Sequence, residues 1–158
     1  MLKFTDYYIT FQEVPNEVAL VFTISNCPFA CEGCHSPWLQ KDEGENISEH
    51  FTDIVQRYQD EVTCVCLMGE GCGESDRFQV MELFRLARAA GLKTCLYTGA
   101  EIGPCQKGEE PIDYLKLGPY VQSRGGLDSR STNQRMYKWN RDSEQYEDIT
   151  SWFWRKKV

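Results

Sequence analysis

Apolar segments that alternate with amphipathic ones restrict the fold of this chain more than any other feature of the sequence. Residues 18–24 form a continuous apolar run rich in β-branched side chains, which predicts a strand buried on both faces. Three further runs of the same kind follow at residues 62–68, 92–97 and 112–117. Strands that alternate with helices are typical of right-handed βαβ units. We therefore expect an α/β fold with a mostly parallel sheet.

Two amphipathic helices are expected between these strands. Ser48 is the expected N-cap of the first helix and Ser75 that of the second, and Gly91 follows the last turn of the second. Their apolar positions recur at helical spacing. These positions are Phe51, Ile54, Val55 and Tyr58 in the first helix, and Val80, Leu83, Phe84 and Ala87 in the second.

The rest of the chain fits the same single domain, residues 1–158. Residues 135–140 and 145–149 flank a polar turn, which predicts a hairpin or short edge strands, and Trp152 and Trp154 are expected to pack on the body. The net charge of -7 argues against binding to a nucleic-acid backbone. No apolar run approaches the roughly 20 residues that span a bilayer. Because the first residues form no apolar signal segment, we expect a cytoplasmic protein that does not bind membranes.

Three cysteines lie within one eight-residue stretch: Cys27, Cys31 and Cys34. The next cysteine along the chain is Cys64. Three thiolates this close together can hold three irons of a [4Fe-4S] cluster, whereas an electron-transfer cluster uses four. The fourth iron would then have an open position, as catalytic metal sites do. The spacing therefore favours an iron that binds a substrate.

The same residues allow three other interpretations. Cys31, Cys34 and His35 match the C-x-x-C-H pattern of haem attachment, but this leaves Cys27 without a role. A zinc site could use the three thiolates with His35, although tetrahedral zinc usually takes pairs of ligands from two separate loops. A disulfide framework suits a small secreted chain better than one with ordinary helices and apolar strands. The iron–sulfur site is favoured over each of these alternatives.

Two further loops begin where predicted strands end, as the cysteine loop does. Residues 69–73 place three glycines around Glu70, so the backbone can approach a ligand and the carboxylate can receive an ammonium group. Thr98 and Gly99 follow the next strand. Ligands in such folds collect beyond the carboxyl ends of the strands, so we expect one shared site. The cysteines expected to be core thiols, inside apolar strands, are Cys64, Cys66 and Cys95.

Together these motifs resemble the radical S-adenosylmethionine (SAM) superfamily, whose signature is C-x3-C-x2-C. Within it, the chain is similar to the activating proteins of anaerobic ribonucleotide reductase. The resemblance rests on residues 26–37, 96–99, 113–120 and 126–135, which are spread over most of the length of the chain. The cysteine triad is its most specific part, and the TNQR sequence at residues 132–135 is characteristic of the subgroup.

The resemblance implies a compact partial (βα) barrel that binds a [4Fe-4S] cluster and SAM. Cys27, Cys31 and Cys34 would hold three irons, and the amino and carboxylate groups of SAM would bind the fourth. Reductive cleavage of SAM then gives a 5′-deoxyadenosyl radical, which takes a hydrogen atom from a glycine of the large reductase subunit. No catalytic residue is expected beyond the cluster ligands. The residues expected to bind SAM are Gly69, Glu70, Gly71, Thr98, Gly99 and His35.

The resemblance also implies partners. They are the large subunit of anaerobic ribonucleotide reductase and an electron donor such as a flavodoxin or ferredoxin. The family often has Gly-Gly-Glu/Asp followed by proline, and this chain departs from it, so either Glu70 or Glu74 could meet the SAM amine. Arg130, Asn133 and Arg135 are candidates for docking the reductase, for holding SAM or for pinning the C-terminal segment. The alternative functions are activation of another glycyl-radical enzyme, a different radical SAM reaction and a non-catalytic iron–sulfur or zinc protein.

Overall fold

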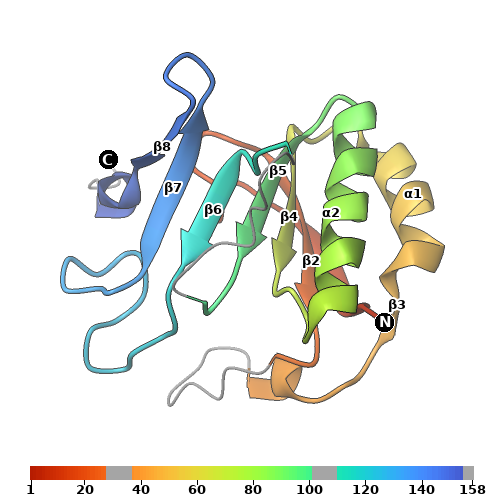
Figure 1. Cartoon of the computed structure of the whole chain (residues 1–158), viewed down its shortest axis with the longest axis horizontal. Helices are drawn as coiled ribbons and strands as arrows, with labels where there is room; N and C mark the ends of the chain where they lie inside the picture. Colours follow the sequence, from red (N-terminus) through yellow and green to blue (C-terminus); the bar gives the residue numbers. More distant parts are fainter. Residues whose placement is uncertain (28–36, 101–109, 155–158) are drawn as a thin grey trace.

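The computed structural model describes residues 1–27, 37–100 and 110–154. In this part of the chain one mixed sheet of eight strands runs in the order β3-β1-β2-β4-β5-β6-β7-β8, and helices α1 and α2 lie on one of its faces (Figure 1). The strands are β1 (Lys3–Thr10), β2 (Ala19–Ile24), β3 (Glu45–Asn46), β4 (Cys64–Met68), β5 (Lys93–Tyr97), β6 (Tyr114–Leu117), β7 (Arg135–Asn140) and β8 (Gln145–Asp148). The helices are α1 (Ile47–Tyr58), α2 (Glu74–Ala89) and the short 3-10 segments η1 (Pro37–Gln40) and η2 (Thr150–Trp154).

The four central strands, β2, β4, β5 and β6, are parallel neighbours. Their side chains are mostly buried, which explains the near-continuous apolar run that marks each of them in the sequence. Antiparallel strands extend the sheet on both sides, with β1 and β3 beside β2, and β7 and β8 beside β6. The predicted α/β class, the four strands and the C-terminal hairpin are confirmed. The sheet as a whole is mixed because the added edge strands run antiparallel.

Helices α1 and α2 turn their apolar stripes to the sheet, as predicted. The buried members of the two stripes belong to one core cluster: Phe51, Ile54, Val55, Val80, Leu83, Phe84 and Ala87. The predicted end of α2 is also confirmed, because Gly91 has a φ of 81° and its amide donates to the Arg88 carbonyl at 2.9 Å. Neither helix has the length and apolar content that crossing a membrane requires.

The helix starts differ from those predicted. The Ser48 amide donates to Asn46 Oδ1 at 3.1 Å, so Asn46 is the N-cap of α1. The Ser48 hydroxyl is used elsewhere, since it accepts a hydrogen bond from Gln79 Nε2 at 2.7 Å and links α1 to α2. Helix α2 begins one residue before Ser75 and has Gly73 at its N-cap. Both serine predictions were therefore wrong, because a neighbouring residue already occupies the capping position.

The opposite face of the sheet carries a second apolar cluster, covered by residues 11–18 and by η2. Val14 is fully buried in this cluster, and Trp152 packs against it. Trp154 Nε1 donates to the Leu127 carbonyl at 2.9 Å, so the expected packing of the C-terminal tryptophans on the body is confirmed. The three predicted core thiols, Cys64, Cys66 and Cys95, are also fully buried here. Burial raises the pKa of the Cys64 and Cys95 thiols, which therefore stay protonated.

Strand β1 is an element that the sequence patterns missed. It pairs with β2 along most of its length, but a bulge between Phe4 and Asp6 shifts the register. The bulge breaks the alternation of apolar and polar side chains by which a half-buried strand is recognised. Only the start of β1 is covered on its outer side, where Lys3 and Phe4 pair with β3. An edge strand of this kind leaves a weak signal in the sequence.

Candidate functional site

The four parallel strands end at one edge of the sheet, which we name the carboxyl edge. In Figure 1 the arrowheads of β4, β5 and β6 point to this edge. Ser25, Gly69, Thr98 and Gly118 each directly follow one of these strands. The parallel register therefore brings together the loops that the sequence singled out.

The cysteine loop is anchored at this edge through its base. The Asn26 amide donates to the Lys41 carbonyl at 2.9 Å, and the Cys27 amide donates to the Leu39 carbonyl at 2.8 Å. Asn26 has a φ of 58°, which turns the chain sharply after β2. The chain thus leaves the sheet and returns to it at one place, with half-buried Cys27 at the start of the loop. The other members of the motif, Cys31, Cys34 and His35, lie outside the described residues.

The glycine loop after β4 is shaped by contacts within the protein. Gly69 has a φ of 117°, and a Cβ at this position would lie 3.0 Å from the Cβ of Ile24. Its amide donates to the Tyr97 carbonyl at 2.9 Å. A Cβ at Gly71 would lie 2.4 Å from Asp76 Oδ2. Glycine is favoured at both positions because the backbone has a positive φ and passes close to neighbouring protein atoms.

Glu70 is the carboxylate that this loop turns into the molecule. Its side chain is 9% exposed, and Oε1 accepts a hydrogen bond from Thr98 Oγ1 at 3.0 Å. Oε2 is buried and has no hydrogen-bond partner, although it forms an ion pair with Arg77 Nε at 3.9 Å. Glu74 begins α2 and is exposed to solvent. Of the two carboxylates that the sequence left open, only Glu70 has a buried oxygen without a hydrogen bond.

Thr98 connects the ends of three strands. Besides its bond to Glu70, its Oγ1 accepts from the Ala100 amide at 3.1 Å, and its own amide donates to the Lys116 carbonyl at 3.0 Å. Lys116 Nζ donates to the Thr98 carbonyl at 3.3 Å and to the Gly118 carbonyl at 2.8 Å. These bonds fix Thr98, and therefore Glu70, against the sheet. Gly99 follows Thr98 directly and is half-buried.

Lys116 is a residue of this edge that the sequence analysis missed. It is only 8% exposed and lies 5.9 Å from the centroid of the Tyr97 ring. A charged side chain is rarely buried unless it is hydrogen-bonded or paired. A lysine within a predicted apolar strand was therefore the signal that could have identified it.

Buried polar atoms without a hydrogen-bond partner gather at the carboxyl edge. Within the described residues there are four such side-chain atoms, and three of them are Ser25 Oγ, Glu70 Oε2 and Asn133 Oδ1. Ser25 and Glu70 follow parallel strands, and Asn133 precedes β7, which starts at the same edge because it runs antiparallel to β6. Buried polar atoms are nearly always hydrogen-bonded, so this concentration of unpaired acceptors is typical of a ligand site.

The loop beyond β6 also borders open space at this edge. Residues 120–123 form the described lining of a cavity of about 460 Å³. The Asn133 amide Nδ2 donates to the Pro119 carbonyl at 3.0 Å, which holds Asn133 beside the start of this loop. This cavity follows β6 along the chain, and its described lining does not include Ser25, Glu70 or Asn133.

The two arginines considered for docking contact the C-terminal segment. The Arg130 guanidinium lies 5.7 Å from the centroid of the Trp154 ring. Arg135 forms an ion pair with Asp148 of β8 at 3.7 Å and is 42% exposed. Of the roles considered for Arg130 and Arg135, these contacts favour pinning of the C-terminal segment.

Comparison with known proteins gave no match: no protein-family model, no curated protein and no solved structure is similar to this chain. The family resemblance drawn from the motifs therefore stays a prediction.

We expect Gly71→Ala to destabilise the protein more than Gly73→Ala. Both glycines have a positive φ, at 68° and 87°, so each substitution carries the cost of a left-handed alanine. Only at Gly71 would the new Cβ meet Asp76, whereas nothing lies within 4 Å at Gly73. The excess loss in unfolding free energy should be at least about 1 kcal/mol, measured by urea denaturation. Equal losses for the two variants would contradict the close contact at Gly71.

Proposed function

We propose that this protein is a radical SAM enzyme that activates a glycyl-radical enzyme, the anaerobic ribonucleotide reductase. The observation that carries the proposal is the buried Oε2 of Glu70, which has no hydrogen-bond partner and lies at the edge of the sheet where the cysteine loop is anchored. A carboxylate oxygen in such a place suits an ammonium group, which is what SAM would present to it. The C-x3-C-x2-C motif supplies the other half of the site.

The proposal requires a [4Fe-4S] cluster and SAM. Cys27, Cys31 and Cys34 would hold the [4Fe-4S] cluster, and the backbone bonds at Asn26 and Cys27 fix the base of their loop. The bound cluster and SAM would supply reductive cleavage of a carbon–sulfur bond, which gives methionine and a 5′-deoxyadenosyl radical able to take a hydrogen atom from the target glycine. The soft thiolates of this loop are the ligands that an iron–sulfur cluster prefers.

The protein's own residues bind and orient the substrate in this proposal. Glu70 receives the ammonium group, and Thr98 holds the other oxygen of Glu70 so that Oε2 keeps its direction. Asn133 Oδ1 and Ser25 Oγ are further acceptors that suit hydroxyl donors, such as those of a ribose. Exclusion of water from this edge strengthens each of these interactions.

The proposal also includes the type of barrel, the partner proteins and the location in the cell. Parallel β2, β4, β5 and β6 with α1 and α2 on one face suit a compact partial (βα) barrel of the radical SAM type. The large reductase subunit would present its glycine at the carboxyl edge, and a flavodoxin or ferredoxin would supply the electron. All these partners would meet the protein in the cytoplasm.

The first test concerns the cysteines. Cys27→Ser, and likewise serine at Cys31 or Cys34, should abolish the cluster and the formation of 5′-deoxyadenosine, because each removes one iron ligand. The unchanged protein, reconstituted without oxygen, should bind about four irons. Cys72→Ser is the matched control, since Cys72 is exposed in the neighbouring glycine loop. Retention of cluster and cleavage by Cys27→Ser, or loss of both in Cys72→Ser, would contradict the assignment.

The second test shows whether Glu70 or Glu74 binds the ammonium group of SAM. Glu70→Gln should weaken SAM binding by about tenfold or more, because a neutral amide replaces the charged acceptor of the ammonium group. Glu74→Gln removes the same charge from an exposed position and should leave the affinity nearly unchanged. Calorimetric titration of the reconstituted protein with SAM measures both. A larger loss for Glu74→Gln would overturn the role of Glu70.

A further inference from the structure

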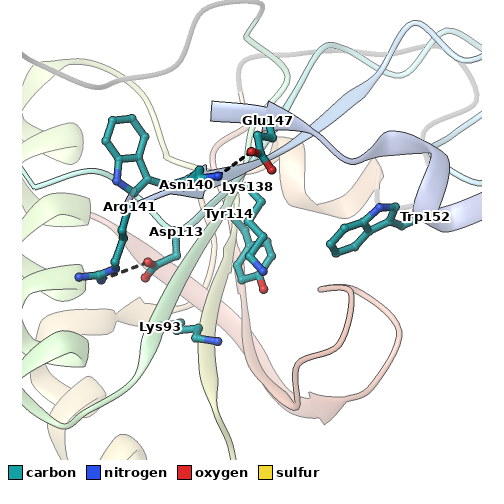
Figure 2. Close-up of a pocket in the computed structure, with 9 residues that line it drawn as sticks. Lys93, Asp113, Tyr114, Lys138, Asn140, Arg141, Glu147 and Trp152 are labelled. Carbon is teal, nitrogen blue, oxygen red and sulfur yellow. Dashed lines mark hydrogen bonds and ion pairs between the residues drawn. The ribbon is translucent and has the colours of Figure 1, made fainter. Parts of the chain in front are cut away.

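A second cavity opens at the opposite edge of the sheet, where β5 and β6 begin and β7 ends. Its volume is about 380 Å³, within the range of small-molecule sites, which is roughly 300–1,000 Å³. The lining comes from the ends of β5, β6 and β7, from the residues beside them, from β8 and from η2, and it includes Tyr114 and Trp152 (Figure 2). No residue proposed to bind the cluster or SAM lines it.

Two of the three cations that line this cavity are neutralised. Lys93 Nζ lies 2.6 Å from Glu17 Oε1. Arg141 lies 3.5 Å from Asp113 Oδ1, and the other oxygen of Asp113 accepts from the Thr94 amide at 2.9 Å. The dashed line between Arg141 and Asp113 in Figure 2 marks this pair. Neither cation therefore has an uncompensated charge to offer.

Lys138 is the third cation, and no described carboxylate pairs with it. Its Nζ lies 5.8 Å from the centroid of the Tyr114 ring and 5.7 Å from that of the Trp152 ring. Glu147 is its partner across the β7–β8 ladder, but Glu147 Oε1 accepts from Asn140 Nδ2 at 2.6 Å. Among the described residues no carboxylate lies within 4 Å of Lys138 Nζ. The half-buried ammonium group thus lies at the cavity against two aromatic rings.

The aromatic side of the cavity is held in place by hydrogen bonds. The Met136 amide donates to Thr150 Oγ1 at 2.9 Å, and the Trp152 amide donates to the Ile149 carbonyl at 2.9 Å. Together with the bond from Trp154 Nε1 to the Leu127 carbonyl, these fix η2 against β7. Figure 2 shows Trp152 on one side of Lys138 and the Arg141–Asp113 pair on the other. The lysine and the indole thus line one cavity from fixed elements.

We propose that this cavity binds a small organic anion, with its phosphate or carboxylate on Lys138 Nζ and its planar ring against Trp152. The ammonium group has three N–H donors, and ring faces satisfy them less well than an oxyanion does. A ring on the same molecule would cover the indole at the mouth of the cavity. The site goes beyond the proposed activity, because it lies at the amino ends of the parallel strands, away from the carboxyl edge.

The test uses the full chain and two probes, uridine 5′-monophosphate and orotate, titrated by calorimetry at low ionic strength. Both combine a pyrimidine ring with an anion, and the tighter of the two identifies phosphate or carboxylate as the preferred group. Lys138→Gln should weaken the tighter probe by about tenfold or more, while Lys138→Arg should retain most of the affinity. Uridine and inorganic phosphate, as the two halves of the nucleotide, should each bind more weakly than the whole.

Two matched variants locate the binding. Arg57→Gln removes the same charge from an exposed position on α1, on the other face of the sheet, and should leave the affinity unchanged. Glu70→Gln, at the carboxyl edge, should leave it unchanged as well, which separates this site from the proposed SAM site. Absence of binding by both probes up to about 10 mM would overturn the proposal. Binding that Lys138→Gln does not weaken would overturn it too.

Discussion

The parallel register of β2, β4, β5 and β6 is the constraint on which the rest of the structure depends. Because the four strands point the same way, the residues that follow each of them meet at a single edge. Burial on both faces makes this register costly to shift, since a slip of one residue would exchange the side chains of the two apolar clusters. The positions of the residues that directly follow these strands, among them Ser25 and Thr98, therefore depend on that register.

The carboxyl edge concentrates polar atoms that the protein leaves unsatisfied. A buried carboxylate oxygen without a hydrogen-bond partner lowers the stability of the folded state, and a ligand ammonium group would restore the lost interaction. Glu70 is kept in this condition by Thr98, which is itself fixed by Lys116 and by the β5–β6 ladder. In the proposed function, the ammonium group of SAM would supply the hydrogen bond that Oε2 lacks.

Much of the fold could be predicted from the sequence, because long apolar runs and helical spacing report burial directly. The four central strands, both helices and the hairpin were of this kind. The N-caps were mistaken because several polar residues compete at each helix start, as Asn46 and Ser48 do. Strand β1 was missed because its bulge interrupts the alternation that reveals a half-buried strand. When several residues near a helix start could serve as the N-cap, tertiary contacts decide between them, and local patterns do not report those contacts.

The sequence predicted which loops form the candidate site, but it did not predict the contacts of the individual side chains in those loops. The contact of Gly69 with Ile24, which makes a side chain costly there, could not be foreseen from the sequence. A lysine inside an apolar run was the one signal for Lys116. The contact of Lys138 with Trp152 joins β7 to η2, so no spacing along the chain could have indicated it. The preference for Glu70 over Glu74 likewise depends on burial, which only the structure supplies.

Electron paramagnetic resonance of the reduced, reconstituted protein, recorded with and without SAM, is the most direct test of the proposed function. A cluster held by three cysteines leaves its fourth iron with an open position, so SAM should change the signal of the cluster by binding to that iron. A signal that SAM leaves unchanged, in a protein carrying a full [4Fe-4S] cluster, would contradict a radical SAM enzyme.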